Sequence, residues 1–258
     1  LANKQDGDFG DNGDYGQAFL SEQDAGSGAY KVVSHSPQEL TMLEKFPDYF
    51  LGFAETAPDV VRQRYSVESA TMRTLMARKE HEVSSQWHPQ EVFKALAGEE
   101  GISLITEGGS GSLLFKLNTQ RAPTDDVNFR KAMALAFDYD ALISTLQITD
   151  TVSSGTPARG PIPDGVPGFD ANLPMPQRDL EAAKAALAES KYASDLANVE
   201  IDMAWVAEVP SEEKMALLFQ QNMAELGVKV NITKVPWATL TERFAAAETT
   251  PNLYPLFT

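Results

Sequence analysis

The chain has 258 residues, of which 43% are hydrophobic and 22% are charged. These proportions are typical of a globular protein with a sizeable core, and they exclude a wholly disordered chain. Asp and Glu number 37 against 21 Lys and Arg, so the net charge of -16 repels phosphate backbones and we expect no nucleic-acid partner. Cysteine is absent, which excludes disulfides and thiol chemistry.

The first quarter of the chain combines an acidic, glycine-rich start with three strand patterns. Residues 1–25 are polar and rich in Asp and Gly, which predicts an irregular acidic surface segment. Runs of apolar and β-branched residues predict strands over residues 28–33, 39–46 and 60–65. Turn-forming serines and a proline separate the first two of these strands.

Helices and short strands are predicted to alternate between residues 66 and 118. Met72, Leu75 and Met76 place one apolar stripe on a helix over residues 66–79. A strand is predicted over residues 82–86, followed by a helix that Pro89 opens and Gly98 ends. Two further strands, over residues 102–107 and 112–118, are predicted to flank a sharp bend at residues 108–111, where almost no side chains are present.

The clearest helix pattern follows Asp125, which we expect to cap the helix. Its apolar positions recur with the helical period, at Phe129, Ala132, Met133, Ala136 and Phe137. A further helix is predicted to start near Asp140 and to end near Leu146. Between residues 153 and 177 the prolines are too dense for a helix or a strand, so an ordered wrapping loop is predicted.

The last third of the chain predicts a strand–helix–strand unit. A helix over residues 179–190 precedes a strand over residues 199–205. Ser211 is expected to cap the next helix and Gly227 to end it, before a second strand over residues 228–232. Two strands joined by a helix are expected to lie parallel with a right-handed crossover. A helix over residues 237–247 and a strand over residues 253–257 complete the pattern.

The sequence lacks the patterns that catalysis or a metal site would need. His81 and His88 do not form H-E-x-x-H, and no G-x-S-x-G is present. The N-terminal aspartates do not fit a calcium loop, and neither glycine-rich turn has a phosphate-binding motif. Carboxylate pairs such as Glu212 and Glu213 are interpreted as solvated charges at helix ends. We therefore expect no catalytic residue, no metal site and no cofactor.

Aromatic residues at strand ends are the remaining candidates for a binding site. Ligands of open α/β sheets bind beyond the carboxyl ends of parallel strands, and Trp205 ends the first strand of the strand–helix–strand unit. The loop that follows it contains Ala207 and Glu208, and this carboxylate could meet a ligand ammonium. Trp87, with Gln86 before it, is a second candidate. The alternative is that Trp205 belongs to the core and Glu208 faces solvent.

Several segments, in their order along the chain, resemble the family 5 extracellular solute-binding proteins, which include the dipeptide- and oligopeptide-binding components of ABC importers. Residues 26–32 (GSGAYKV) and 43–50 (LEKFPDYF) are similar to the family's G-T-G-P-Y-K and N-P-D-Y-W. Residues 117–123 (LNTQRAP), 125–132 (DDVNFRKA) and 136–140 (AFDYD) resemble its N-T-x-x-x-P, D-D-x-R-V-R-x-A and A-x-D-x-D. The proline-rich loop and the helix over residues 179–192 also resemble family segments.

The resemblance implies an α/β, periplasmic-binding-protein-like (type II) fold with two lobes, of which this chain is an incomplete part. Family members are longer at both ends, so we expect a fragment that lacks N- and C-terminal parts. Residues 26–118 are expected to belong to the larger lobe and residues 119–250 to the second lobe. Residues 251–258 are expected to start a strand that returns to the first lobe.

The implied function is capture of a peptide or other small polar solute and its delivery to the permease subunits of an ABC importer, without catalysis. We expect a monomer that is periplasmic, or exported and membrane-associated. By resemblance, Gly109 and Ser110 join Gln86, Trp87 and the loop over residues 205–208 on the cleft wall. Two alternatives stay open: an oligosaccharide-binding protein of the same fold, and a secreted hydrolase domain.

Overall fold

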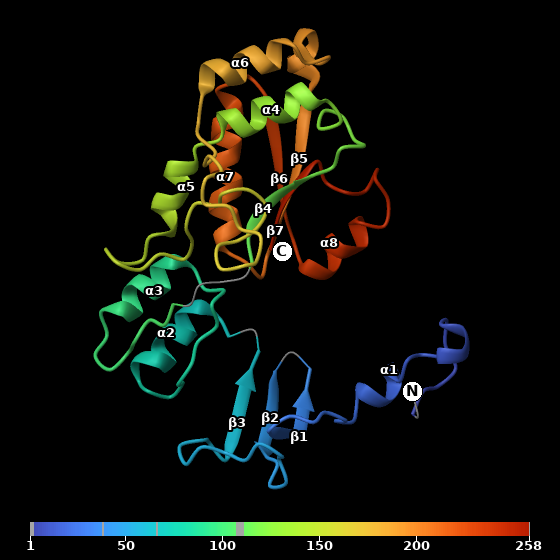
Figure 1. Cartoon of the computed structure of the whole chain (residues 1–258), viewed down its shortest axis with the longest axis vertical. Coiled ribbons are helices and arrows are strands. Elements are labelled where there is room, and N and C mark those ends of the chain that lie inside the picture. Colours follow the sequence, from blue (N-terminus) through green and yellow to red (C-terminus); the bar gives the residue numbers. More distant parts are fainter. Residues whose placement is uncertain (1–2, 38, 66, 107–110, 258) are drawn as a thin grey trace. The chain divides into compact units, whose positions relative to one another are not determined.

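Two β-sheets organise the structure, one in each of two units formed by residues 1–68 and 69–258 (Figure 1). The structure is a computed structural model that describes residues 3–37, 39–65, 67–106 and 111–257. In the first unit, β1 (Tyr30–Ser36), β2 (Leu40–Lys45) and β3 (Val60–Arg64) form an antiparallel sheet with β2 in the centre. These strands confirm the three that the sequence predicted there.

Two short helices, η1 (Gly10–Asn12) and α1 (Gln17–Leu20), interrupt the irregular acidic segment that the sequence predicted. The carboxylate of Asp14 organises the segment, because it accepts hydrogen bonds from the backbone N–H groups of Gln5, Gly16 and Ala18. These bonds favour the charged carboxylate and lower the pKa of Asp14. An aspartate that the sequence pattern treated as solvated charge thus holds the local backbone together.

The sheet of the second unit has four strands in the order β4 (Leu113–Leu117), β7 (Leu253–Phe257), β5 (Glu200–Val206) and β6 (Lys229–Val235). β5 runs parallel to β6 and to β7, whereas β4 runs antiparallel to β7. The parallel β5–β6 pair, joined by a helix, confirms the strand–helix–strand unit. β7 lies between β4 and β5, and the lobe boundaries that the family resemblance implied stay a prediction.

Helices cover both faces of this sheet (Figure 1). On one face α4 (Val127–Ala136) and α7 (Ser211–Ala224) pack with α6 (Leu180–Ala188) around the main core, while α5 (Tyr139–Leu146) contacts α7. On the other face α8 (Trp237–Arg243) buries Leu240 against Ala204 and Val206. Successive residues of a strand face opposite sides of a sheet, so β5 contributes to both cores.

Two predicted helix caps were wrong by one residue. Asp126, not Asp125, caps α4, because its side chain accepts a 2.8 Å hydrogen bond from the backbone N–H of Phe129. Asp125 instead binds Lys191 at 2.7 Å and the Tyr192 hydroxyl at 2.8 Å. At α7 the capping position is held by Pro210, so Ser211 is the first helical residue and makes no cap.

The predicted end of α7 is correct. Gly227 has φ +74°, a left-handed conformation that glycine adopts without strain, and the chain turns there from the helix into β6. The same geometry lets the backbone N–H of Val228 bond the carbonyl of Met223 at 3.0 Å. The turn therefore fixes where β6 starts beside β5.

Between residues 69 and 106 the structure is helical where predicted, and no strand forms in the described parts of the two segments where strands were expected before β4. The two helices are α2 (Ser69–Ala77) and α3 (Gln90–Ala97), with Gly98 at the end of α3. The expected strands over residues 82–86 and, in its described part, 102–106 are loops. Most of the expected bend at residues 108–111 lies outside the described residues. Later in the chain, the 3-10 helix η2 (Ala193–Asn198) precedes β5, and the proline-rich stretch forms a loop as predicted.

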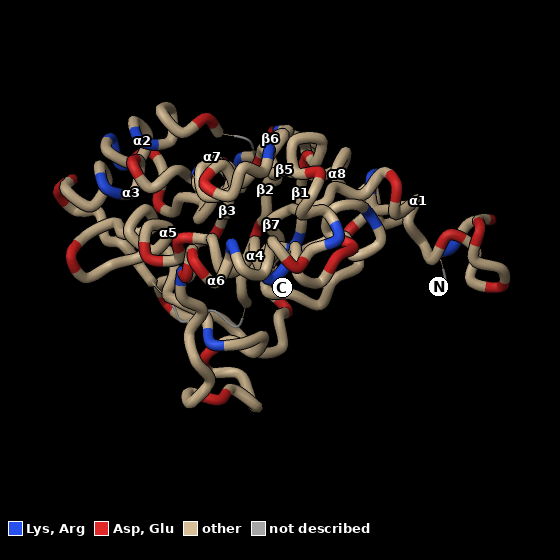
Figure 2. The backbone as a smooth tube through the Cα atoms, turned by 90° about the horizontal axis from the view of Figure 1, so that it is seen from above, with Lys and Arg blue, Asp and Glu red and all other residues tan. Residues whose placement is uncertain are grey.

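Asp and Glu are spread over most of the backbone and are more numerous than Lys and Arg (Figure 2). Several of the Asp and Glu positions lie in the N-terminal segment. None of the described helices has the length and apolar character needed to cross a membrane.

Candidate functional site

The candidate site lies at the edge of the second sheet where three parallel strands end. β5, β6 and β7 run in one direction, so their carboxyl ends meet at one edge. The antiparallel strand β4 starts at this edge, because Leu113 pairs with Phe257. Ligands of open α/β sheets bind outside the carboxyl ends of their strands. The edge brings together the end of β5, the end of β7 and the loop before α3.

Trp205, the proposed aromatic anchor, is buried in the main core. Its side chain is 4% exposed and packs in the cluster that contains Met203 and Phe219. The ammonium of Lys234 on β6 lies 5.0 Å from the centre of the indole ring. This burial fits the alternative that Trp205 is a core residue, and its contact with a ligand stays a prediction.

The next two candidates, Ala207 and Glu208, are hydrogen-bonded to β6 and to the start of α8. The backbone N–H of Ala207 donates a 2.9 Å hydrogen bond to the carbonyl of Val235, so the sheet continues one residue beyond β5. Glu208 is exposed, and both of its carboxylate oxygens accept from the backbone N–H of Trp237, at 3.1 and 3.3 Å. The carboxylate therefore already has a partner at the start of α8.

Trp87 is brought to the same edge from a loop, not from a strand end as the sequence predicted. Its ring is 39% exposed and meets the ring of Phe257 edge-on, with the ring centroids 4.9 Å apart. Gln86, beside it, is exposed. Gly109 and Ser110 lie outside the described residues, so their place at this edge stays a prediction.

Sequence reasoning missed the most unusual side chain at this edge, the buried carboxyl of Glu212. Only 2% of Glu212 is exposed, and its Oε2 accepts a 2.8 Å hydrogen bond from the backbone N–H of Val206. Burial and the nearby charge of Glu208 raise its pKa to about 7, although the bond from Val206 lowers it. The prediction of a solvated Glu212 was therefore wrong.

A signal for this burial was present in the helical period. Glu212 lies four residues before Ala216 and seven before Phe219, both of which face the core. Glu213, one position further round the helix, is exposed. The position of Glu212 on the same face of the helix as these apolar residues therefore indicates that its carboxyl is buried.

The histidines considered for a metal site do not form one. His88 is buried, and its Nδ1 lies 3.1 Å from the Ser69 hydroxyl; burial lowers the pKa of its imidazole. In the described ranges no group of three or more His, Asp and Glu side chains is placed to hold a metal ion.

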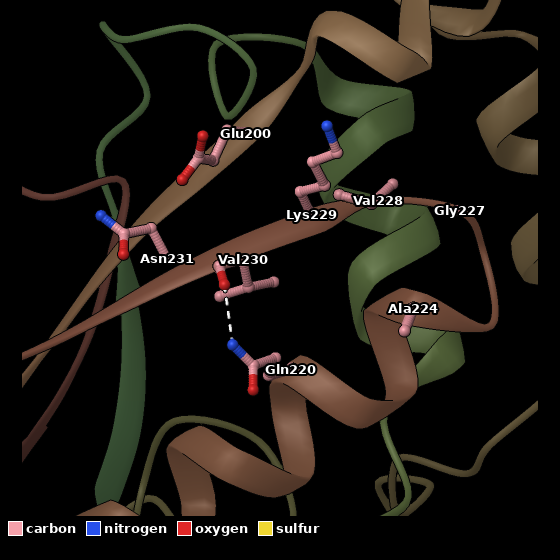
Figure 3. Close-up of a pocket in the computed structure, with 8 residues that line it drawn as sticks. All are labelled: Glu200, Gln220, Ala224, Gly227, Val228, Lys229, Val230 and Asn231. Carbon is pink, nitrogen blue, oxygen red and sulfur yellow. Dashed lines mark hydrogen bonds between the residues drawn. The ribbon is translucent and has the colours of Figure 1, made fainter.

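A separate pocket of about 530 Å³ opens at the other end of the β5–β6 pair (Figure 3). The pocket is lined by Glu200 at the start of β5 and by Lys229 and Asn231 near the start of β6. Residues of α7 and of the turn before β6 complete the lining. Gln220 of α7 donates a 2.8 Å hydrogen bond to the Val230 carbonyl there. The pocket lies at the amino ends of the strands, so it is not part of the candidate site.

Comparison with known families and proteins gives consistent matches along the chain. The family model described as bacterial extracellular solute-binding proteins, family 5 middle, matches residues 9–253. The probable D,D-dipeptide-binding periplasmic protein DdpA of Escherichia coli K12 is 25% identical over 232 residues, which cover 89% of this chain and 42% of that protein. Heme-binding protein A of Haemophilus influenzae is 28% identical over 158 residues, 59% of this chain and 27% of that protein.

The fold is also similar to that of solved proteins. The dipeptide-binding protein from Pseudoalteromonas sp. SM9913, solved in complex with Met-Leu, matches with a TM-score of 0.74 at 23% identity. The match covers 90% of this chain and 44% of that one. This confirms the predicted type II periplasmic-binding-protein-like α/β fold in partial form. The chain spans less than half the length of each of these three relatives.

Proposed function

The chain belongs to the family 5 bacterial extracellular solute-binding proteins, and from this premise we propose that the complete protein captures a peptide or other small polar solute for an ABC importer. The observation that carries the proposal is the family match over residues 9–253, nearly the whole chain. Proteins of this type close two lobes over a solute and deliver it to a membrane permease. The proposed partners are therefore the solute and the permease subunits.

A peptide is the solute that we propose first. The relative named for binding D,D-dipeptides and the similar protein solved in complex with Met-Leu support it. The partly exposed rings of Trp87 and Phe257 offer apolar surface for a peptide side chain at the carboxyl edge of the sheet. A relative named for heme shows that family members differ in their ligand.

We propose that the ligand contacts come from the loop after β5 and the segments beside it. The set is Gln86, Trp87, Trp205, Ala207, Glu208, Gly109 and Ser110. Further contacts would come from parts of the complete protein that this chain does not contain, since relatives are more than twice as long. The proposed lobes are residues 26–118, with a return at residues 251–258, and residues 119–250.

The proposed setting is outside the cytoplasm, in the periplasm or at the outer side of the membrane, with the protein acting as a monomer. The family description, extracellular solute-binding proteins, supports this setting. Capture and release of a solute need no bond-making step, so the proposed role is binding without catalysis.

Isothermal titration calorimetry on the complete protein tests this function. The titrants are the dipeptide Met-Leu, heme and maltotriose, each with product analysis after incubation. We expect saturable binding of the dipeptide and its recovery unchanged. Binding of heme or maltotriose without the dipeptide would overturn the peptide proposal, and cleavage of any titrant would overturn the non-catalytic role.

A further inference from the structure

Glu212, in the first turn of α7, is hydrogen-bonded to two points of the loop between β5 and α7. Its side-chain Oε2 accepts from the backbone N–H of Val206 at 2.8 Å. Its own backbone N–H donates to the carbonyl of Val209 at 3.0 Å. Glu212 therefore holds the start and the middle of a loop that contains the proposed ligand contacts Ala207 and Glu208.

The carboxyl of Glu212 accepts a hydrogen bond that a carbonyl of a neighbouring strand would otherwise accept. Alternate N–H groups of a strand point to opposite neighbours, and Ala207 donates to β6, so the N–H of Val206 points toward β7. Among the described residues, however, β5 and β7 pair only at Met203 and Leu253, so the described part of β7 gives Val206 no paired carbonyl. The carboxyl of Glu212 supplies the missing acceptor where the two strands separate.

The charges around Glu212 disfavour its ionised form. Glu208, in the same loop, is the charged group that acts on it, and this carboxylate is held at the start of α8 by the N–H of Trp237. Among the described cations none forms an ion pair with Glu212. Lys214 of α7 pairs with Glu91 of α3, and Lys234 of β6 lies over the Trp205 ring.

Other charged and titratable groups of the surrounding elements are directed elsewhere. Glu213 of α7 is exposed, Arg243 of α8 binds Asp202, and Tyr254 of β7 packs against Phe244. Burial and the charge of Glu208 thus raise the pKa of Glu212, and no cation among the described residues pairs with it to oppose them. The single bond from Val206 is the interaction that favours its charged form.

We propose that Glu212 is a positioning residue whose neutral form holds the loop over residues 207–210, and with it the ligand-contacting edge, in the arrangement seen here. Ionisation places a negative charge on the buried Glu212, beside the charge of the exposed Glu208. The strain is relieved when Glu212 leaves Val206 or when Glu208 leaves Trp237, and either movement loosens the loop. The effect on ligand binding rests on the proposed function, whereas the effect on the loop does not.

Amide NMR of the complete, ligand-free protein tests the loop directly. The Val206 and Trp237 N–H shifts are followed from about pH 5.5 to about pH 8.5, and we expect both to titrate with a midpoint near the Glu212 pKa of about 7. Glu212→Gln should abolish this titration, while Glu213→Gln, the exposed neighbour, should keep it. A flat Val206 shift in the wild type, or a titration that persists in Glu212→Gln, would overturn the proposal.

Calorimetry with the dipeptide Met-Leu tests the consequence for binding. If the neutral form holds the binding edge, wild-type affinity should fall about tenfold between about pH 6 and about pH 8, because each pH unit above the pKa lowers the neutral fraction about tenfold. Glu212→Gln should bind equally at both pH values. Equal wild-type affinities together with a titrating Val206 would overturn the positioning role. No dipeptide binding at either pH would refute the proposed function, and the NMR result would still decide whether Glu212 controls the loop.

Discussion

Arg121 and Asp202 are joined by a 2.9 Å ion pair between guanidinium NH1 and carboxylate Oδ2, across 81 positions of sequence. The same carboxylate oxygen accepts a 2.8 Å hydrogen bond from NH2 of Arg243 at the end of α8. The side chain of Asp202 is 21% exposed, so solvent screens it only in part. One carboxylate on β5 thus ties the segment after β4 to the segment before β7.

Asp202→Asn is expected to lower the free energy of unfolding by about 1.5–3 kcal/mol, the range for hydrogen bonds to charged groups. The neutral amide leaves two partly buried guanidinium groups without their counter-charge. Urea unfolding of both proteins measures the change. The matched control is Glu181→Gln, which removes the exposed pair with Lys184 and should change stability by less than about 1 kcal/mol. Equal effects of the two substitutions would contradict the role of the Asp202 cluster.

Trp205→Ala is expected to lower stability by about 3–5 kcal/mol, the range for removing a large buried aromatic side chain. The reason is its burial, since 4% of the side chain is exposed within the main core. Trp237→Ala, at a ring 44% exposed, serves as the control and should cost much less. Urea unfolding gives both values. A cost for Trp205→Ala no larger than that for Trp237→Ala would contradict the core role.

Dipeptide titration of the same Trp205→Ala variant decides its proposed ligand contact. A lost aromatic anchor should weaken binding by about 1–3 kcal/mol, in addition to the lost stability. Unchanged affinity in the folded variant would remove Trp205 from the site and leave Trp87 as its aromatic candidate.

The strand–helix–strand unit could be predicted from the sequence because its signals are local. Alternating apolar residues define β5, the helical period defines α7, and Gly227 at φ +74° marks the turn into β6. A helix between two such strands also predicts their parallel pairing, which the structure has. The helical period could not determine which residue caps α4, because Asp125 and Asp126 have the same side chain and both precede the helix.

No strand forms over residues 82–86 or over residues 102–106, the described part of the predicted strand 102–107, because a strand does not depend on local signals alone. A strand is stabilised by a partner elsewhere in the chain, and nothing in a short apolar alternation shows whether the partner exists. Val83 and Ile105, which lie in these two segments, are 82% and 86% exposed. The contact of Trp87 with Phe257 is equally non-local, because the pairing of β7 with β4 and β5 creates it.

Trp87→Ala is expected to weaken dipeptide binding by about 1–3 kcal/mol while stability changes by no more than about 1.5 kcal/mol. The ring is 39% exposed at the proposed ligand edge, and its contact in the folded chain is the edge-on approach to Phe257. Calorimetry and urea unfolding measure the two quantities. Trp87→Phe keeps an aromatic face and should retain most of the affinity. Unchanged binding by Trp87→Ala would place the solute away from this ring.

Glu212→Gln is expected to remove one component of the dependence of stability on pH. Burial raises the pKa of Glu212 to about 7 in the folded chain, from an ordinary value of 4.5. Between these two values the folded protein keeps a proton that the unfolded chain has released, so stability falls as pH rises. The loss is complete above the folded pKa and amounts to about 3 kcal/mol. Glutamine keeps the shape and an acceptor for Val206 but carries no charge at any pH.

Urea unfolding of wild type and Glu212→Gln at a series of pH values isolates this component, because contributions from other groups cancel in the difference. At about pH 4 the two proteins should differ little, since the wild-type carboxyl is then neutral in the folded state. Toward about pH 8 the variant should become more stable than the wild type by up to about 3 kcal/mol. Glu213→Gln changes an exposed carboxylate on the same helix, so its curve should run parallel to that of the wild type. A Glu212→Gln curve that is also parallel would mean that the buried carboxyl ionises in the folded protein at its ordinary pKa.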